Sequence, residues 1–106
     1  MSEPVYIVAA RRTPIGAFQG ALSPLTPPQP GAAAVQAATK DSGLSAEQID
    51  ETILGCVPMA GIGQAPGRQA ALAGGVPQKV PATTINKMCG SGLKAVMMAA
   101  DQIRAG

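Results

Sequence analysis

The chain has 106 residues, a formal net charge of +2 and no histidine, and its length fits a single domain. Its basic residues are scattered, and it has one phenylalanine, one tyrosine and no tryptophan, so nucleic-acid binding has little support. No apolar run approaches the roughly 20 residues that span a bilayer. Two cysteines without histidine cannot supply four soft ligands for zinc. We therefore expect no nucleic-acid partner, no membrane partner and no metal.

The start of the sequence has no basic stretch followed by an apolar run, which is the pattern of a secretory signal. We therefore expect a cytoplasmic protein whose two cysteines, Cys56 and Cys89, are free thiols.

The first half of the chain predicts one strand and one helix. Residues 5–9 form an almost continuous apolar run, typical of a strand buried on both faces. Residues 13–30 are dense in proline and glycine and predict a loop. Residues 31–42 are rich in alanine and predict a helix that Gly43 terminates. Residues 45–50 have the spacing of a capping box and predict a short turn.

The second half predicts two strands that alternate with two helices. We expect strands over residues 52–57 and 80–86, and a glycine-rich loop over 58–66. Helices are expected over residues 67–73 and 90–105, the latter with one apolar face. The order β-α-β-α-β-α predicts an α/β fold with a mainly parallel sheet and helices on both faces.

Cys89 is the candidate catalytic residue, because it lies where the third predicted strand turns into the last helix. Unpaired backbone N–H groups and the positive end of the helix dipole favour the thiolate, which is the form that attacks a carbonyl carbon. Gly90 and Gly92 are candidate supporting residues, which let a substrate or another backbone come close.

Three segments carry a resemblance to a known family. Residues 85–96 read INKMCGSGLKAV, which closely resembles the acyl-enzyme segment of thiolases, the acetyl-CoA acetyltransferase family. Residues 8–16 read VAARRTPIG and resemble the opening strand and loop of that family. Residues 61–71 read GIGQAPGRQAA and resemble its glycine-rich loop and the helix that follows. The resemblance covers nearly the whole chain.

The resemblance implies a thiolase-like fold, of which residues 1–106 are the N-terminal part of the N-terminal domain, so that the domain is incomplete. It implies an acyltransferase of lipid metabolism that condenses two acetyl-CoA molecules to acetoacetyl-CoA and CoA, and that catalyses the reverse thiolysis. The intermediate would be an acyl thioester on Cys89. The resemblance also implies acyl-CoA substrates, no cofactor besides the coenzyme A thioester itself, and a homodimer or homotetramer.

The sequence leaves alternatives open. A degradative 3-ketoacyl-CoA thiolase of broader chain length shares the same cysteine segment. In thiolases a histidine activates the nucleophile and a second cysteine acts as acid and base, and this chain supplies no counterpart of either. We therefore expect the isolated chain to be inactive, and a non-catalytic fragment or interaction remnant is a further alternative. Cys56, in an apolar predicted strand, reads as structural.

Overall fold

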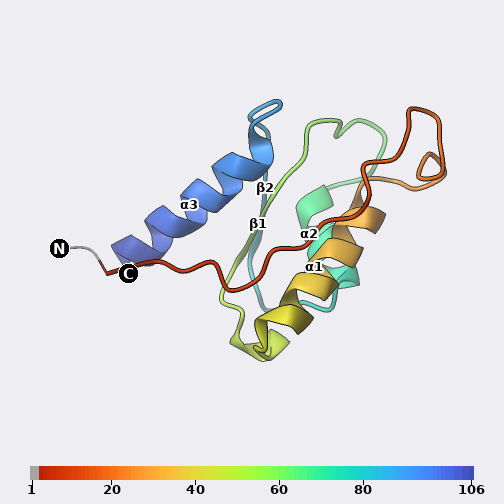
Figure 1. Ribbon diagram of the computed structural model, residues 1–106. Helices are drawn as coiled ribbons and strands as arrows, with labels where there is room; N and C mark the ends of the chain where they lie inside the picture. Colours follow the sequence, from red (N-terminus) through yellow and green to blue (C-terminus); the bar gives the residue numbers. More distant parts are fainter. Residues whose placement is uncertain (1–2) are drawn as a thin grey trace.

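A computed structural model describes residues 3–106 and contains two strands and four helical segments (Figure 1). In chain order these are α1 (Pro28–Ser42), a 3₁₀ turn η1 (Ala46–Gln48), β1 (Thr52–Gly55), α2 (Pro66–Ala73), β2 (Ala82–Ile85) and α3 (Ser91–Ala105). The two strands are joined through α2, as in a βαβ unit. The predicted α/β class is confirmed, and the later strands and all three helices lie where the sequence predicts them, within a few residues at their ends.

The sheet consists of β1 and β2, which pair in parallel. Thr52 faces Ala82, and the register continues without a bulge to Gly55, which faces Ile85. One more backbone hydrogen bond, from the Cys56 N–H to the Ile85 carbonyl at 2.9 Å, follows the last strand pair. The carboxyl ends of both strands, and the loops that leave them, therefore lie at the same edge of the sheet.

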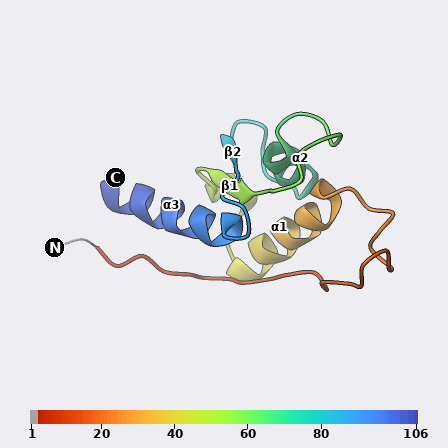
Figure 2. The same ribbon diagram turned by 90° about the horizontal axis from the view of Figure 1, so that it is seen from above.

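Helices α2 and α3 cover opposite faces of this sheet (Figure 2). Successive side chains of a strand point to opposite faces. Leu54 contacts α2, because its Cβ lies 3.3 Å from where a Cβ on Gly67 would be. Gly55, the next residue, faces the first turn of α3. Helix α1 packs on α2, and both lie on the side of the sheet opposite α3 (Figure 2).

Local sequence signals set the ends of the first two helical segments. Prolines occupy the first positions of α1, where a missing N–H costs nothing. Gly43 ends α1 with φ of 74°, as predicted. Ser45 and Gln48 form the predicted capping box of η1: Ser45 Oγ accepts from the Glu47 N–H, and Gln48 Oε1 accepts from the Ser45 N–H.

The start of α2 is capped from the neighbouring strand. Its N-cap residue, Ala65, has no side chain that can accept a hydrogen bond. The hydroxyl of Thr84 in β2 instead accepts a hydrogen bond from the Gly67 N–H at 2.9 Å. One of the free N–H groups at the helix start is thereby satisfied through the fold rather than by a local motif.

The strand predicted over residues 5–9 is wrong: the segment runs outside the other elements as unpaired chain (Figure 2). A strand needs a hydrogen-bonding neighbour, and within residues 3–106 no backbone hydrogen bond joins this segment to β1 or β2. Tyr6 and Ile7 are accordingly 75% and 79% exposed. An ion pair of 2.9 Å between Arg11 and Asp41 ties the end of the segment to α1.

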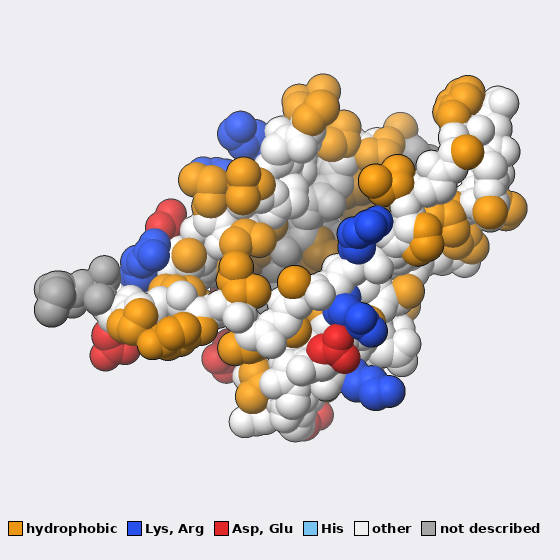
Figure 3. All heavy atoms as spheres, viewed as in Figure 1, with side chains coloured by type: hydrophobic (Ala, Val, Ile, Leu, Met, Phe, Trp, Pro, Cys, Tyr) orange, Lys and Arg blue, Asp and Glu red, His pale blue; other side chains and the backbone are white. Residues whose placement is uncertain are grey.

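The buried core is small and lies on the α2 side of the sheet. Ala71, Val76 and Val80 form its centre, and Val35, Ile49 and Ala82 pack against it. The other side of the sheet is poorly covered, and large apolar side chains of α3 are exposed there and elsewhere along the helix (Figure 3). They are Leu93, Val96, Met97 and Ile103, each more than half exposed.

Candidate active site

Cys89 is exposed and unpaired in the turn between β2 and α3. The turn spans residues 86–90, and α3 begins at Ser91 with Gly90 as its N-cap. The helix has 15 residues, so its aligned peptide dipoles place positive potential at the end where the thiol lies. The predicted position of Cys89 at a strand–helix junction is confirmed.

Local hydrogen bonds hold the turn tightly. The Met88 N–H donates to Asn86 Oδ1 at 3.0 Å, and the Gly90 N–H donates to the Lys87 carbonyl at 3.1 Å. The Ser91 N–H donates to the Met88 carbonyl, also at 3.1 Å. Across residues 3–106, the Cys89 N–H is the donor of no such hydrogen bond. It can therefore donate to an oxygen that is brought up to the thiol.

Met88, the residue before the nucleophile, has a left-handed backbone with φ of 46°. This conformation costs a residue with a side chain on the order of 1–3 kcal/mol, and it persists only where surrounding contacts impose it. The Met88 side chain is 65% exposed, so packing of that side chain does not impose it. We therefore attribute the left-handed conformation of Met88 to the hydrogen bonds of the turn.

The turn is also connected to the loop after β1. Asn86 Nδ2 donates to the Val57 carbonyl at 3.4 Å, so one amide side chain bonds both the cysteine turn and the neighbouring loop. Further along that loop, Gln69 Nε2 donates to the carbonyls of Ile62 and Gln64, each at 2.8 Å. The glycine-rich loop is thus fixed to α2 at one end and to the cysteine turn at the other.

Gly90 and Gly92, the predicted supporting residues, have few neighbours within residues 3–106. A Cβ on Gly92 would have nothing within 4 Å, and one on Gly90 would make only ordinary contacts with Lys87. Both residues follow the nucleophile, but neither lies against another backbone of the described chain. The close approach occurs instead at Gly55, where a Cβ would lie 2.6 Å from the backbone carbon of Ser91.

Of the ionisable residues, Lys87 shares the turn with Cys89, and its Nζ lies 3.6 Å from where a Cβ on Gly90 would be. Others have partners elsewhere. Arg11 pairs with Asp41, and Arg12 donates to the carbonyl of Thr13. Cys56 is half-buried just after β1. In residues 3–106 there is no group of three histidine, cysteine or acidic side chains that could hold a metal, and no helix there is long and apolar enough to cross a membrane.

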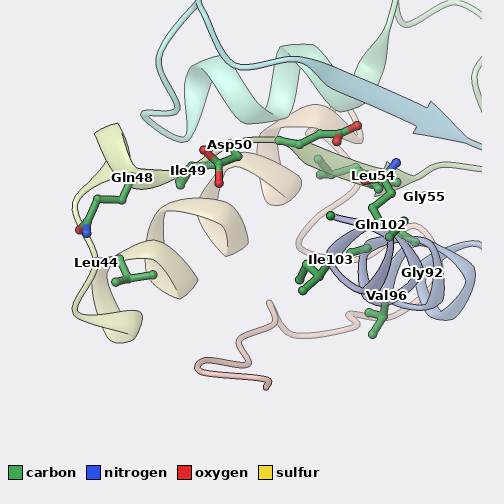
Figure 4. Close-up of a pocket in the computed structure, with 16 residues that line it drawn as sticks. Leu44, Gln48, Ile49, Asp50, Leu54, Gly55, Gly92, Val96, Gln102 and Ile103 are labelled. Atoms are coloured by element: carbon green, nitrogen blue, oxygen red, sulfur yellow. The ribbon is translucent and has the colours of Figure 1, made fainter. Parts of the chain in front are cut away.

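A large groove lies away from the thiol, between α3, β1 and the turn around η1 (Figure 4). Its volume is about 1030 Å³, and Cys89 is not among its lining residues. Figure 4 shows Val96 and Ile103 of α3 and Leu44 on the opposite side contributing apolar walls. The groove therefore lies where α3 leaves β1 only partly covered, and Gly92 in the first turn of α3 is one of its lining residues.

The sequence analysis missed three residues that shape this site: Gly55, Asn86 and Ser91. Asn86 and Ser91 have a local signal, because short polar side chains near a turn commonly bond the backbone within a few residues. Gly55 has none, since its role depends on a contact with a residue 36 positions later (91 − 55).

Comparison with known proteins agrees with this arrangement. Residues 5–106 match the family described as thiolase, N-terminal domain. The chain is 53% identical over 102 residues to acetyl-CoA acetyltransferases of Cupriavidus necator and of Pseudomonas aeruginosa, which covers 96% of this chain and 26% of each relative. It is 50% identical over 103 residues to the cytosolic acetyl-CoA acetyltransferase ERG10 of Gibberella zeae, covering 97% of this chain and 26% of that protein.

The chain thus spans about a quarter of the length of these curated relatives. The matched region includes β1, β2, the cysteine turn and α3. The match extends over almost all of the chain, and the chain belongs to the thiolase family, in the N-terminal domain of that family.

Proposed function

We propose that this chain supplies the acyl-accepting nucleophile of an acetyl-CoA acetyltransferase, and that Cys89 is that nucleophile. The observation that supports the proposal most directly is the exposed thiol at the start of a 15-residue helix, in a chain of the thiolase family. A thiolate is a strong nucleophile toward a thioester carbonyl.

The proposed first step transfers an acetyl group to the cysteine. Cys89 Sγ attacks the carbonyl carbon of acetyl-CoA, the bond from that carbon to the coenzyme A sulfur breaks, and CoA leaves as a thiolate that takes up a proton. In the second step the methyl carbon of another acetyl-CoA loses a proton and attacks the acetyl-cysteine carbonyl. This forms acetoacetyl-CoA and returns the Cys89 thiolate. Thiolysis is the reverse sequence.

The turn offers a donor for the negative oxygen of the tetrahedral intermediates. The Cys89 N–H is without a partner in residues 3–106 and adjoins the attacking sulfur. Such a preorganised donor stabilises the charge that develops in the transition state. We propose that Gly90 and Gly92 serve here by leaving space for the substrate, since a Cβ on Gly92 would extend into open space.

The chain supplies only part of the catalytic groups. It contains no histidine, so the proton acceptor for Cys89 must come from elsewhere. Because the chain covers 26% of its relatives, we propose that it works as the N-terminal portion of a longer polypeptide that provides this base and a second acid–base group. We further propose acyl-CoA substrates, in keeping with the names of the relatives. We also propose a cytoplasmic homo-oligomer without a separate cofactor.

Mapping the acetylated residue tests the proposal. The complete enzyme is incubated with acetyl-CoA, digested and analysed by mass spectrometry, alongside Cys89→Ser and Cys56→Ser. We expect acetyl on Cys89 in the parent and in Cys56→Ser, with condensation lost in Cys89→Ser. Acetylation at Cys56 instead of Cys89 would refute the assignment and give the role to Cys56. Acetyl on neither cysteine would favour the non-catalytic alternative.

Rates with longer acyl chains separate the two enzymatic alternatives. We expect acetyl-CoA and acetoacetyl-CoA to be the preferred substrates, as in the names of the relatives. Comparable kcat/KM for longer 3-ketoacyl-CoA thioesters would favour the degradative thiolase instead.

A further inference from the structure

The hydroxyl of Ser91 has an unusual place beside the nucleophile. It donates to the Met88 carbonyl at 2.6 Å and accepts from the Lys87 N–H at 2.9 Å. Ser91 is only 5% exposed, and in residues 3–106 it is the one buried side chain that is polar. Both hydrogen bonds are part-buried. Loss of the hydroxyl would leave the Lys87 N–H without its acceptor, whereas the Met88 carbonyl would keep its hydrogen bond from the Ser91 N–H.

These two hydrogen bonds span the nucleophile. Lys87 and Met88 precede Cys89 and Ser91 follows it, so the hydroxyl closes a ring of chain around the cysteine. The ring includes Met88, whose left-handed backbone needs an external restraint. The bond to the Met88 carbonyl is the shortest hydrogen bond of the turn and acts directly on that strained residue.

Ser91 is itself fixed to the sheet. Its Cβ lies 2.7 Å from where a Cβ on Gly55 would stand, so its backbone rests against the end of β1. The hydroxyl therefore connects the end of β1, on which Ser91 rests, to the turn that holds the thiol. A hydroxyl that only capped the helix would need neither the bond to a preceding carbonyl nor this close seat on the strand.

We propose that Ser91 is a positioning residue for Cys89: its hydroxyl holds Met88 in the left-handed conformation and thereby aims the thiol and the Cys89 N–H at the substrate carbonyl. Being buried, Ser91 does not contact the substrate and acts through the turn. The proposal rests on the assignment of Cys89 as the nucleophile.

Ser91→Ala in the complete enzyme removes the hydroxyl and little else. Ser42→Ala is the matched control, because Ser42 Oγ also bonds in both directions, donating to the Thr39 carbonyl at 2.6 Å and accepting from the Leu44 N–H at 3.1 Å. Ser42 lies at the end of α1, far along the chain from the cysteine turn. Ser91→Gly, which also lacks the hydroxyl, is the second variant if the alanine protein folds poorly.

Four quantities are measured for each variant: the unfolding temperature, the kcat and the KM of acetyl transfer, and the rate of Cys89 alkylation by iodoacetamide. We expect both serine variants to lose a similar amount of stability. For Ser91→Ala we expect kcat and the alkylation rate to fall roughly tenfold or more with KM little changed, because small misplacements of a reacting group are costly. For Ser42→Ala we expect kcat and the alkylation rate to equal those of the parent enzyme.

The proposal is overturned if Ser91→Ala and Ser42→Ala have the same alkylation rate and kcat, or if Ser91→Ala changes KM alone. The alkylation rate reports the geometry of the turn even in a protein that is never acetylated. Absence of acetyl on Cys89 in the parent enzyme would therefore refute the proposed function, whereas unchanged alkylation in Ser91→Ala would refute the role of Ser91.

Discussion

A Cβ built on Gly55 would stand 2.7 Å from the Cβ of Ser91 and 2.6 Å from its backbone carbon. Real Cβ atoms essentially never come this close to other heavy atoms. The first turn of α3 therefore rests on β1 only because residue 55 has no side chain. Since Cys89 lies two residues before Ser91, this contact sets the distance of the nucleophile from the sheet.

Gly55→Ala should force the start of α3 away from β1. We expect the free energy of unfolding of the complete enzyme to fall by about 1–3 kcal/mol, as for other overpacked sites, together with slower acetylation of Cys89. Denaturant unfolding and the pre-steady-state release of CoA measure the two effects.

Gly92→Ala is the control, since its Cβ would enter open space in the first turn of a helix. Its stability should hold or rise by up to about 1 kcal/mol, the difference in helix propensity between glycine and alanine. Equal stability losses in Gly55→Ala and Gly92→Ala would contradict the close contact. A slower acetylation of stable Gly92→Ala would support the proposed role of Gly92 in substrate approach.

The left-handed backbone of Met88 predicts an order among substitutions at this position. Met88→Gly should raise the free energy of unfolding or leave it unchanged, because glycine adopts positive φ without cost. Met88→Ile should lower it by about 1 kcal/mol or more, because branching at Cβ makes that conformation harder still. Thermal unfolding of both variants decides this, and a more stable Met88→Ile protein would speak against the strained turn.

The cap of α2 by Thr84 predicts a cost for removing one hydroxyl. Thr84→Val preserves the shape of the side chain but leaves the Gly67 N–H without its acceptor. We expect a loss of about 1–2 kcal/mol in unfolding free energy, within the range for lost caps. Thr83→Val is the control, because Thr83 is exposed on the opposite face of the same strand. Similar effects from the two substitutions would show that the cap contributes nothing.

The exposed face of α3 predicts poor behaviour of the 106 residues expressed alone. Leu93, Val96 and Met97 are 69%, 53% and 51% exposed, and apolar patches of this kind promote association. Both outer edges of the two-stranded sheet also lack a partner in residues 3–106. Size-exclusion chromatography should show aggregates, with thiolysis of acetoacetyl-CoA at background. A monodisperse monomer with cooperative unfolding would contradict this expectation.

The sequence predicts those elements of the fold whose signals are local. The capping box at Ser45, the terminating Gly43 and the apolar face of α3 depend on residues within a few positions of one another. The strand expected over residues 5–9 fails because an apolar run specifies burial but not the neighbour that completes a sheet. Tyr6, Ile7 and Val8 remain exposed to solvent.

In the candidate site, too, features with a local sequence signal can be predicted, and features that depend on distant contacts cannot. The place of Cys89 at a strand–helix junction can be predicted, because it needs only the order of two adjacent elements. The close contact of Gly55 with Ser91 cannot, because many glycines in the sequence look alike until the chain is folded. The roles of Gly90 and Gly92 stay predictions, since a Cβ on Gly92 would meet nothing within 4 Å in the described residues.

The hydrogen bond from Asn86 to the Val57 carbonyl has a consequence for engineering the enzyme. This hydrogen bond connects the start of the glycine-rich loop to the cysteine turn, although 29 positions separate the two residues. A mutational library confined to residues 58–64 should therefore yield variants with altered thiol reactivity, even though every natural residue next to the sulfur is retained. Selection for acceptance of bulkier acyl donors can begin in that loop, leaving the nucleophile and its turn untouched.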